Sequence, residues 1–200
     1  GRPPGRLADL GGGVGYFARC ALDQGWDAYS IDVSPLAVAA AGERIGPQRS
    51  FVAPPAHLLG TCDVVTLWCV VAHVNDPRSI LIQALNLLKP GGRLLITTPN
   101  LVFQLRYIAL LARLGRPIDF REHDHLLHYS PTALRTILRQ AGVDRVSYTY
   151  FGVHEDCVAH RGLAPVVVPL KRIWNRVAVA AQRRGLPLWS SELQAVAIKR

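Results

Sequence analysis

The sequence predicts an α/β domain built on a doubly wound, mostly parallel sheet. Short apolar runs alternate with stretches whose apolar residues recur at helical spacing, which is the pattern of strands joined by crossover helices. A cluster of glycines follows the first apolar run, where a strand is expected to turn into a helix. The chain has 200 residues, of which 50% are hydrophobic, so residues 1–200 are expected to fold as a single domain.

The first four elements follow from their composition and their end signals. Residues 6–10 are an apolar run with one acid, ended by glycines, which predicts a buried strand. Residues 14–25 have apolar residues at helical spacing and end in glycine, which predicts a helix. Residues 26–32 predict a second strand. A helix is expected over residues 34–46, since a serine cap and a proline precede an alanine-rich run.

The next four elements continue the alternation. Apolar runs predict strands over residues 50–53 and 62–71. Residues 76–92 begin with Asp-Pro and end with Pro-Gly-Gly, which predicts a helix between the two prolines. A further apolar run predicts a strand over residues 93–99. The carboxyl ends of these parallel strands should meet at one edge of the sheet, where ligands of such folds bind.

The glycine cluster after the first strand indicates a ligand site. Gly11 and Gly13 allow a tight turn and a close approach of the backbone to a ligand. A dinucleotide site would have the spacing G-x-G-x-x-G, which places a pyrophosphate on the helix N-terminus. Here the third glycine is Gly15, and Tyr16 occupies the third position of the dinucleotide pattern. The spacing therefore opposes an NAD-dependent oxidoreductase.

Two acids bracket the glycines and narrow the choice of ligand. Asp9, inside the end of the first strand, places a negative charge near the loop, which suits a cationic ligand better than a pyrophosphate. Asp32, at the end of the second strand, is placed to accept both hydroxyls of a ribose. An adenosine with a cationic amino-acid tail fits the glycines and both acids.

With these features, the sequence resembles the class I S-adenosylmethionine-dependent methyltransferases. The resemblance covers residues 6–100 well and extends more loosely to the final strand. It implies a Rossmann-like, doubly wound, mostly parallel seven-stranded sheet with helices on both faces. In chain order, the matching stretches are "LADLGGGVGYFA", "YSIDVSP", "CDVVTLWCVVAHVNDP" and "LLKPGGRLLITTPN", then "DHLLHYSPTALRTILRQAGV" and "ELQAVAIK".

The resemblance also implies which residues hold the cofactor, S-adenosylmethionine. The first acid and the glycines would surround its methionine moiety, and the second acid would bind its ribose. Val33 would lie against the adenine, and Trp68 and Cys69 would border the sulfonium. The expected cofactor-binding residues are Asp9, Gly11, Gly13, Gly15, Tyr16, Asp32, Val33, Trp68 and Cys69.

Two departures from the family concern the adenine and the substrate cap. Many relatives have an acid just after the third strand, and here that region contains Pro54, so adenine recognition should rest on backbone, packing or His57. Relatives also have helices before the first strand, which residues 1–5 cannot form. An N-terminal cap is therefore expected to be missing, and residues 101–130 and 154–190 are expected to be substrate-side insertions.

Histidines are the best candidates for catalysis. The stretch "REHDHLLHYSP" should be a loop before a helix that starts at Ser130-Pro131. Its histidines could supply a general base or only hold the loop by hydrogen bonds. A metal site is not expected, because the acids or thiolates of common metal sites are missing. The catalytic candidates are His123, His128 and His73, and the substrate candidates are Asn100, His125 and Tyr129.

The reaction and the partners follow from these candidates. The acceptor is expected to be a small molecule or a glycan- or lipid-linked metabolite, with O-methylation favoured because a hydroxyl benefits from a base. The stretch after the fourth strand lacks the Asn/Asp-Pro-Pro-aromatic motif of amino-methylating relatives. A nucleic-acid substrate is not favoured, since no appended RNA-binding module is visible. The alternative is a non-catalytic accessory protein that binds S-adenosylmethionine.

The basic C-terminal half raises the question of a membrane. Residues 101–200 hold 15 of the 23 Lys and Arg residues and 7 of the 14 acids. Residues 166–185 predict a helix with an apolar face that includes a tryptophan and a basic opposite side. This pattern fits either peripheral membrane contact or packing on the domain. Four cysteines without C-x-x-C pairing, and the absence of a signal peptide, predict a cytoplasmic protein.

Overall fold

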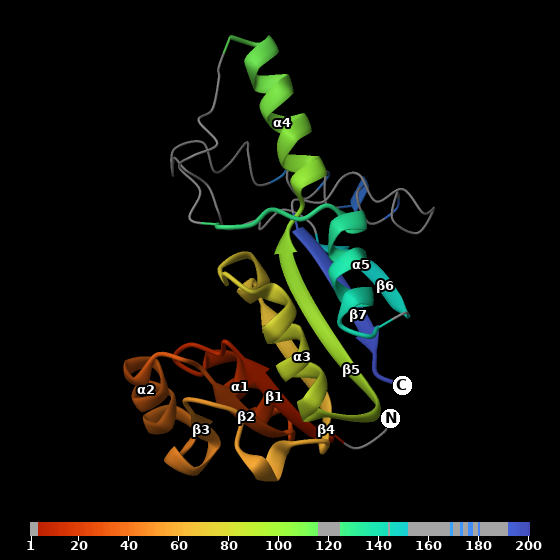
Figure 1. The fold of residues 1–200 in the computed structure, drawn as a ribbon. Helices are drawn as coiled ribbons and strands as arrows, with labels where there is room; N and C mark the ends of the chain where they lie inside the picture. Colours follow the sequence, from red (N-terminus) through yellow and green to blue (C-terminus); the bar gives the residue numbers. More distant parts are fainter. Residues whose placement is uncertain are drawn as a thin grey trace.

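A computed structural model describes residues 4–115, 125–143, 145–151 and 192–200, and the single positions 169, 173, 176, 177 and 180. It has the doubly wound α/β architecture that the sequence predicts (Figure 1). Seven strands form one sheet in the order β3-β2-β1-β4-β5-β7-β6, and β7 runs antiparallel to both of its neighbours.

The elements of the first half lie close to their predicted positions. Helix α1 begins at Tyr16 rather than at residue 14, because Gly15 has φ 79°, outside the helical region. Helix α2 begins as predicted: Pro35 is its first residue, and the Ser34 hydroxyl accepts the Ala37 N–H at 3.3 Å. The elements are β1 (Arg6–Leu10), α1 (Tyr16–Asp23), β2 (Asp27–Ile31), α2 (Pro35–Ile45) and β3 (Ser50–Phe51), with 3₁₀ turns at Pro47–Arg49 and Ala56–Leu58.

The second half differs more from expectation at the element ends. Strand β4 ends at Trp68, because Cys69 has φ 57° and turns the chain into a 3₁₀ turn. The remaining elements are β4 (Cys62–Trp68), a 3₁₀ turn at Val70–Ala72, α3 (Pro77–Leu87), β5 (Leu88–Pro99), α4 (Leu101–Arg113), α5 (Pro131–Gln140), β6 (Val146–Phe151) and β7 (Glu192–Ile198).

The helix predicted between Pro77 and Pro90 begins as expected at Pro77 but ends before Pro90. The helix ends at Leu87, and Leu88 already pairs with Cys62 of β4. The Pro-Gly-Gly sequence lies inside β5, at an irregularity in its pairing with β4. The ammonium of Lys199 donates to the carbonyls of Leu85 and Leu88 at 2.7 and 2.6 Å, which satisfies acceptors at the helix C-terminus.

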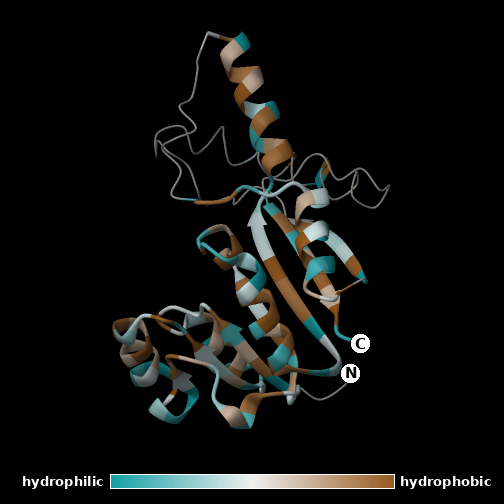
Figure 2. Cartoon of the chain, in the orientation of Figure 1, coloured by the Kyte–Doolittle hydropathy of each residue, from teal (hydrophilic) through white to brown (hydrophobic). Residues whose placement is uncertain are grey.

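Helix α4 occupies much of the stretch that was expected to be a substrate-side insertion. It leaves the carboxyl end of β5 and stands out from the sheet (Figure 1), with apolar residues along its length (Figure 2). The other expected insertion lies between β6 and β7; apart from five single positions, which are helical, it lies outside the described residues, and so does most of the helix predicted over residues 166–185. In the described part of the chain, no helix combines the length and apolarity that crossing a bilayer requires.

The hydrophobic core packs against the central strands of the sheet. Fully buried aliphatic side chains of β4 and β5, such as Leu67 and Ile96, belong to one cluster with Leu81 of α3 and with Leu134 and Leu138 of α5. A large buried side chain contributes about 1.5–3 kcal/mol, so this cluster holds β4 and β5 rigidly side by side. The carboxyl ends of β1, β2 and β4 lie side by side because β1 pairs in parallel with both β2 and β4.

Candidate functional site

A cavity of about 530 Å³ opens at the carboxyl ends of β1, β2 and β4. This is the edge of a doubly wound sheet at which ligands bind. Six of the predicted site residues line it, one or more from each of these strand ends. They are Gly11, Asp32, Val33, Trp68, Cys69 and His73.

The glycine loop adopts backbone conformations that favour glycine. Gly11, Gly13 and Gly15 have φ values of 76°, 54° and 79°. The N–H of Gly11 donates to the carbonyl of Ile31 at 2.7 Å, which ties the loop to the end of β2. A Cβ on Gly11 would collide with the side chain of Val70, which also lines the cavity. Any larger residue at position 11 would therefore displace Val70 and change the shape of the cavity.

Asp32 joins the loop to the cavity. Its Oδ2 accepts the N–H of Gly13 and its Oδ1 accepts the N–H of Ser34, each at 2.9 Å. A carboxylate has about four acceptor positions, so two remain for ligand hydroxyls. Val33, which is 89% exposed, follows it at the rim and offers an apolar surface to a flat ring.

Asp9 is a buried acid beneath the loop and is not among the residues that line the cavity. The Thr66 hydroxyl donates to its Oδ1 at 2.7 Å. Burial raises the pKa of Asp9 to about 6; the Thr66 hydrogen bond opposes this rise and the charge of Asp32 adds to it. Near pH 7 the site therefore holds two negative charges, one of them poorly solvated, and favours a cationic ligand.

Trp68 and Cys69 form the cavity wall at the end of β4. The Trp68 ring packs edge-on against Phe17 with centroids 4.9 Å apart, and its buried Nε1 lacks a hydrogen-bond partner. The Cys69 N–H donates to the Thr97 carbonyl at 3.2 Å and to the Thr97 hydroxyl at 3.0 Å. Burial raises the pKa of the Cys69 thiol, so the thiol is a wall group rather than a nucleophile.

Two expectations about the cofactor side are not supported. Tyr16 is exposed, and its ring centroid lies 4.0 Å from the guanidinium carbon of Arg44, outside the cavity lining. His57 packs edge-on against the rings of Tyr29 and Phe51 and does not line the cavity either. Val52, Ala53 and Pro54 line the side next to Val33, so that side offers backbone and apolar surface.

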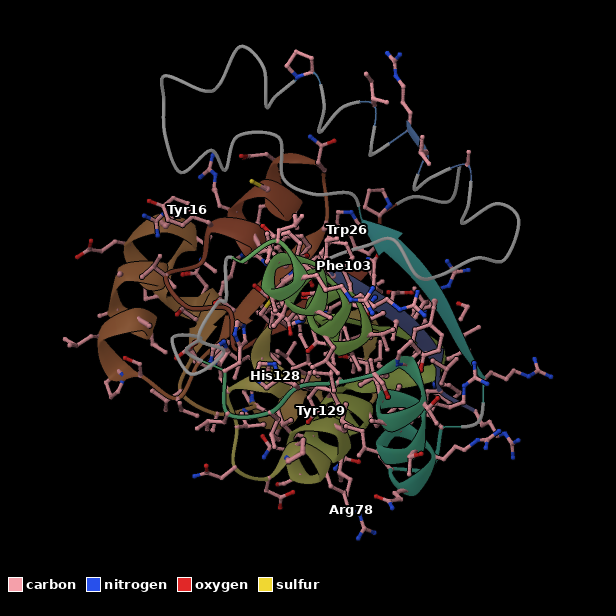
Figure 3. The ribbon with its side chains drawn as sticks, turned by 90° about the horizontal axis from the view of Figure 1, so that it is seen from above. Tyr16, Trp26, Arg78, Phe103, His128 and Tyr129 are labelled. Carbon is pink, nitrogen blue, oxygen red and sulfur yellow. The ribbon has the colours of Figure 1, made fainter. Side chains whose placement is uncertain are left out.

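Three histidines gather at the rim of the cavity. The rings of His73 and His125 have centroids 4.6 Å apart, and those of His125 and His128 are 6.1 Å apart. The backbone brings them together, because the Leu127 N–H donates to the Ala72 carbonyl at 3.0 Å. Figure 3 shows His128 on the segment that leads to α5. His123 lies outside the described residues.

Gln104 is a site residue that the sequence reasoning missed. Its Oε1 lies 3.3 Å from Nδ1 of His128. If this carbonyl oxygen accepts, the His128 proton is on Nδ1 and the lone pair is on Nε2. No motif in the sequence indicates this contact, because Gln104 is reached only when α4 forms and stands beside the histidine segment.

Asn100 and Tyr129 have structural positions rather than the predicted substrate contacts. Asn100 is buried, and its side-chain oxygen accepts the Val102 N–H at 3.2 Å, which caps α4. The Tyr129 ring belongs to the core, and its hydroxyl donates to the Val71 carbonyl at 3.2 Å. Neither lines the cavity. Among the described residues, no group of three His, Cys, Asp or Glu side chains is arranged to hold a metal ion.

The geometry agrees with the comparisons with known proteins. A family of methyltransferase domains matches residues 1–148. The ubiquinone biosynthesis O-methyltransferases of Methylococcus capsulatus and Aromatoleum aromaticum are 31% and 27% identical over 149 and 152 residues, 70% of this chain in each case. The chain spans 63% and 64% of those relatives. The crystal structure of a SAM-dependent methyltransferase from Archaeoglobus fulgidus matches with a TM-score of 0.59 at 17% identity, covering 98% of this chain and 86% of that one.

Proposed function

Because the chain belongs to the methyltransferase domain family, we propose that it transfers a methyl group from S-adenosylmethionine to a hydroxyl oxygen of a small-molecule acceptor. One observation carries the choice of oxygen. His73 lines the same cavity as Asp32, and the ring centroid of His125 lies 4.6 Å from that of His73. A base at the cavity is useful to a hydroxyl acceptor, which loses a proton on methylation. The O-methyltransferase names of the relatives point the same way.

The residues at the cavity fit the cofactor. When bound, S-adenosylmethionine supplies a methyl group on a positively charged sulfur, which needs no further activation. Asp32 would bind the ribose through its remaining acceptor positions, and Val33 would lie against the adenine. The charge of Asp9 beneath the glycine loop would favour the cationic methionine end. Trp68 and Cys69 would border the reacting sulfur and exclude water from it.

The histidines would remove the proton of the acceptor hydroxyl and pass it on. His73 is the member of the cluster that lines the cavity, so it would take the proton from the hydroxyl as its oxygen attacks. His125 and His128 extend the cluster away from the cavity towards α4. They would orient His73 or receive its proton, and His123 stays a further candidate from the sequence alone.

We also propose that the acceptor is lipid-linked and that residues 166–185 contact the membrane peripherally. Two relatives carry names in ubiquinone biosynthesis. Ile173 and Val177 are 58% and 53% exposed at helical positions, with exposed Arg176 between them. Exposed apolar groups beside a cation fit the headgroup region of a bilayer.

Formation of S-adenosylhomocysteine against a panel of hydroxyl-bearing acceptors tests the proposed reaction. His73→Ala should lower turnover by about 100-fold or more while the affinity for S-adenosylhomocysteine is kept. His57→Ala is the matched control, because it removes a histidine packed outside the cavity and should leave turnover unchanged. Full turnover in His73→Ala would remove it from the role of base. Cofactor binding without turnover on any acceptor would instead favour a non-catalytic accessory protein.

A further inference from the structure

Helix α4 is apolar almost all round, and yet none of its residues is buried. Residues 101–115 contain Gln104 and two arginines as the polar side chains besides Tyr107, and no acid. A helix of this composition in a globular protein is normally enclosed by other elements. Here it stands out from the carboxyl end of the sheet (Figures 1 and 2), and four of its large apolar side chains are exposed: Leu105, Tyr107, Leu110 and Leu114.

Three of the four exposed large apolar side chains of residues 101–115 lie on one stripe of the helix, together with half-buried Phe103; the fourth, Leu105, is 54% exposed and lies on the opposite side. At 100° per residue, Phe103, Tyr107, Leu110 and Leu114 fall within an arc of about 60°. Tyr107, Leu110 and Leu114 are 49%, 55% and 65% exposed. The rings of Phe103 and Tyr107 stack with centroids 6.2 Å apart and an interplanar angle of 5°. The stripe therefore runs from an aromatic pair near the foot of the helix to a leucine beyond its last turn.

The charged residues beside the stripe indicate which kind of surface would bind it. Arg106 and Arg113 share one side of it by the same helical geometry, and both are exposed. Gln104, Ile108 and Leu111 are half-buried and form the other border. Arginines can keep their guanidinium groups at lipid phosphates while their aliphatic stems cover apolar surface. With no acid in the helix, an anionic surface would meet attraction along its whole length.

We propose that α4 is an interfacial helix that docks this protein on anionic lipid bilayers through the stripe Phe103, Tyr107, Leu110 and Leu114, with Arg106 and Arg113 at the phosphate level. The exposed positions Ile173 and Val177 provide a second apolar contact next to Arg176. Membrane docking by α4 does not depend on the proposed methyl transfer, which only supplies a reason for the docking. Because α4 begins where β5 ends, docking would bring the cavity edge of the sheet to the lipid surface.

Co-sedimentation of the full chain with vesicles tests the proposal. Phosphatidylcholine vesicles containing about one third phosphatidylglycerol should bind the protein, and pure phosphatidylcholine should bind it more weakly. Binding should weaken with salt, because the screening length falls from about 30 Å at 0.01 M to about 3 Å at 1 M. Failure to sediment with anionic vesicles at low salt would overturn the proposal.

Substitutions on α4 test whether this helix makes the contact. Leu110→Glu should lower binding to anionic vesicles at least tenfold, because it removes apolar contact and adds repulsion. Leu59→Glu is the matched control, since Leu59 is 49% exposed on the loop after Ala56–Leu58, and it should bind as wild type. Arg113→Gln should lower binding about fivefold, whereas Arg78→Gln on the exposed side of α3 should leave it unchanged.

Three outcomes would contradict the assignment to α4. Loss of binding in Val177→Glu with full binding in Leu110→Glu would place the contact on the second segment alone. Equal binding to neutral and anionic vesicles would remove the role of the arginines. The protein could also fail to bind vesicles and form a concentration-dependent dimer that Leu110→Glu abolishes. That result would assign the stripe to an interface with a second copy of the chain. Methyl transfer to a water-soluble acceptor is measured in parallel, so a failed reaction is not confused with failed docking.

Discussion

The carboxylate of Asp32 accepts the backbone N–H of Gly13 at 2.9 Å, so the acid at the end of β2 also holds the glycine loop at the end of β1. One side chain thus shapes the loop and faces the cavity. Asp32→Asn should lower the affinity for S-adenosylhomocysteine by about 10- to 100-fold, since charge-assisted hydrogen bonds contribute about 1.5–3 kcal/mol each. Isothermal titration calorimetry measures this, with Asp23→Asn, an exposed acid of α1, as the control. Wild-type affinity in Asp32→Asn would refute the assignment.

Asp9→Asn should make the protein more stable and its cofactor affinity lower. The raised pKa of Asp9, about 6, means that the folded state holds a proton more tightly than the unfolded state, whose pKa is near 3.8. The ionised side chain then destabilises the fold above about pH 6, by on the order of 3 kcal/mol at two pKa units. The amide keeps an acceptor for Thr66 and removes this cost.

The gain from Asp9→Asn should depend on pH in a defined direction. Urea unfolding should show the full gain at about pH 7.5 and a shrinking gain as the pH falls through 6, because the wild-type carboxyl is then protonated too. Asp23→Asn should show no such trend, since Asp23 is exposed. A gain that is the same at pH 5 and pH 8 would mean that the burial of Asp9 does not carry the effect.

Gly11→Ala and Gly60→Ala should separate backbone strain from steric conflict. Both glycines have positive φ, 76° and 67°, but only at Gly11 would a Cβ meet a neighbour, the side chain of Val70. Gly60→Ala should cost about 1–2 kcal/mol of stability and leave cofactor affinity unchanged. Gly11→Ala should cost more and weaken binding of S-adenosylhomocysteine, and the double variant with Val70→Ala should recover part of both losses. Equal stability losses in the two single variants would contradict the steric explanation.

Gln104→Leu should lower turnover about tenfold with unchanged affinity for S-adenosylhomocysteine, because it removes the acceptor that fixes the His128 proton on Nδ1. Gln104→Glu keeps an acceptor there and should restore turnover. It should also move the acidic limb of the pH–rate profile to higher pH, because a carboxylate favours the protonated ring. Gln140→Leu at the end of α5 is the control. Identical profiles for wild type and Gln104→Glu would argue for a purely structural Gln104.

The parts of the site that were predictable from the sequence depend on backbone chemistry. Glycines after an apolar strand require positive φ, and an acid at the end of the next strand must meet them in a parallel sheet. Gly11, Asp32 and the wall residues Trp68 and Cys69 line the cavity, while their roles in binding stay predictions. The bound positions of cofactor and acceptor stay predictions, as does the role of each histidine.

The parts that were not predictable depend on tertiary pairing. Pro-Gly-Gly commonly ends a helix, but Leu88 is drawn into β5 by its pairing with Cys62. Asn100 and Tyr129 were substrate candidates, but Asn100 caps α4 and Tyr129 belongs to the core, and both positions depend on contacts that the sequence does not show. Helix α4 has apolar residues on every side and thus no clear period, so the sequence pattern did not reveal it.

The cap at Asn100 has a mechanical consequence for α4. The helix is clamped at its foot, where Asn100 pairs with Tyr129 and the Leu101 N–H donates to the Tyr129 carbonyl at 3.0 Å. At about 1.5 Å per residue, Gln104 lies about 6 Å from this pivot and Leu114 about 21 Å from it. The helix is thus a lever with an arm ratio of between three and four. A sideways displacement of about 4 Å at the tip shifts Gln104 by about 1 Å, which is enough to break its contact with His128.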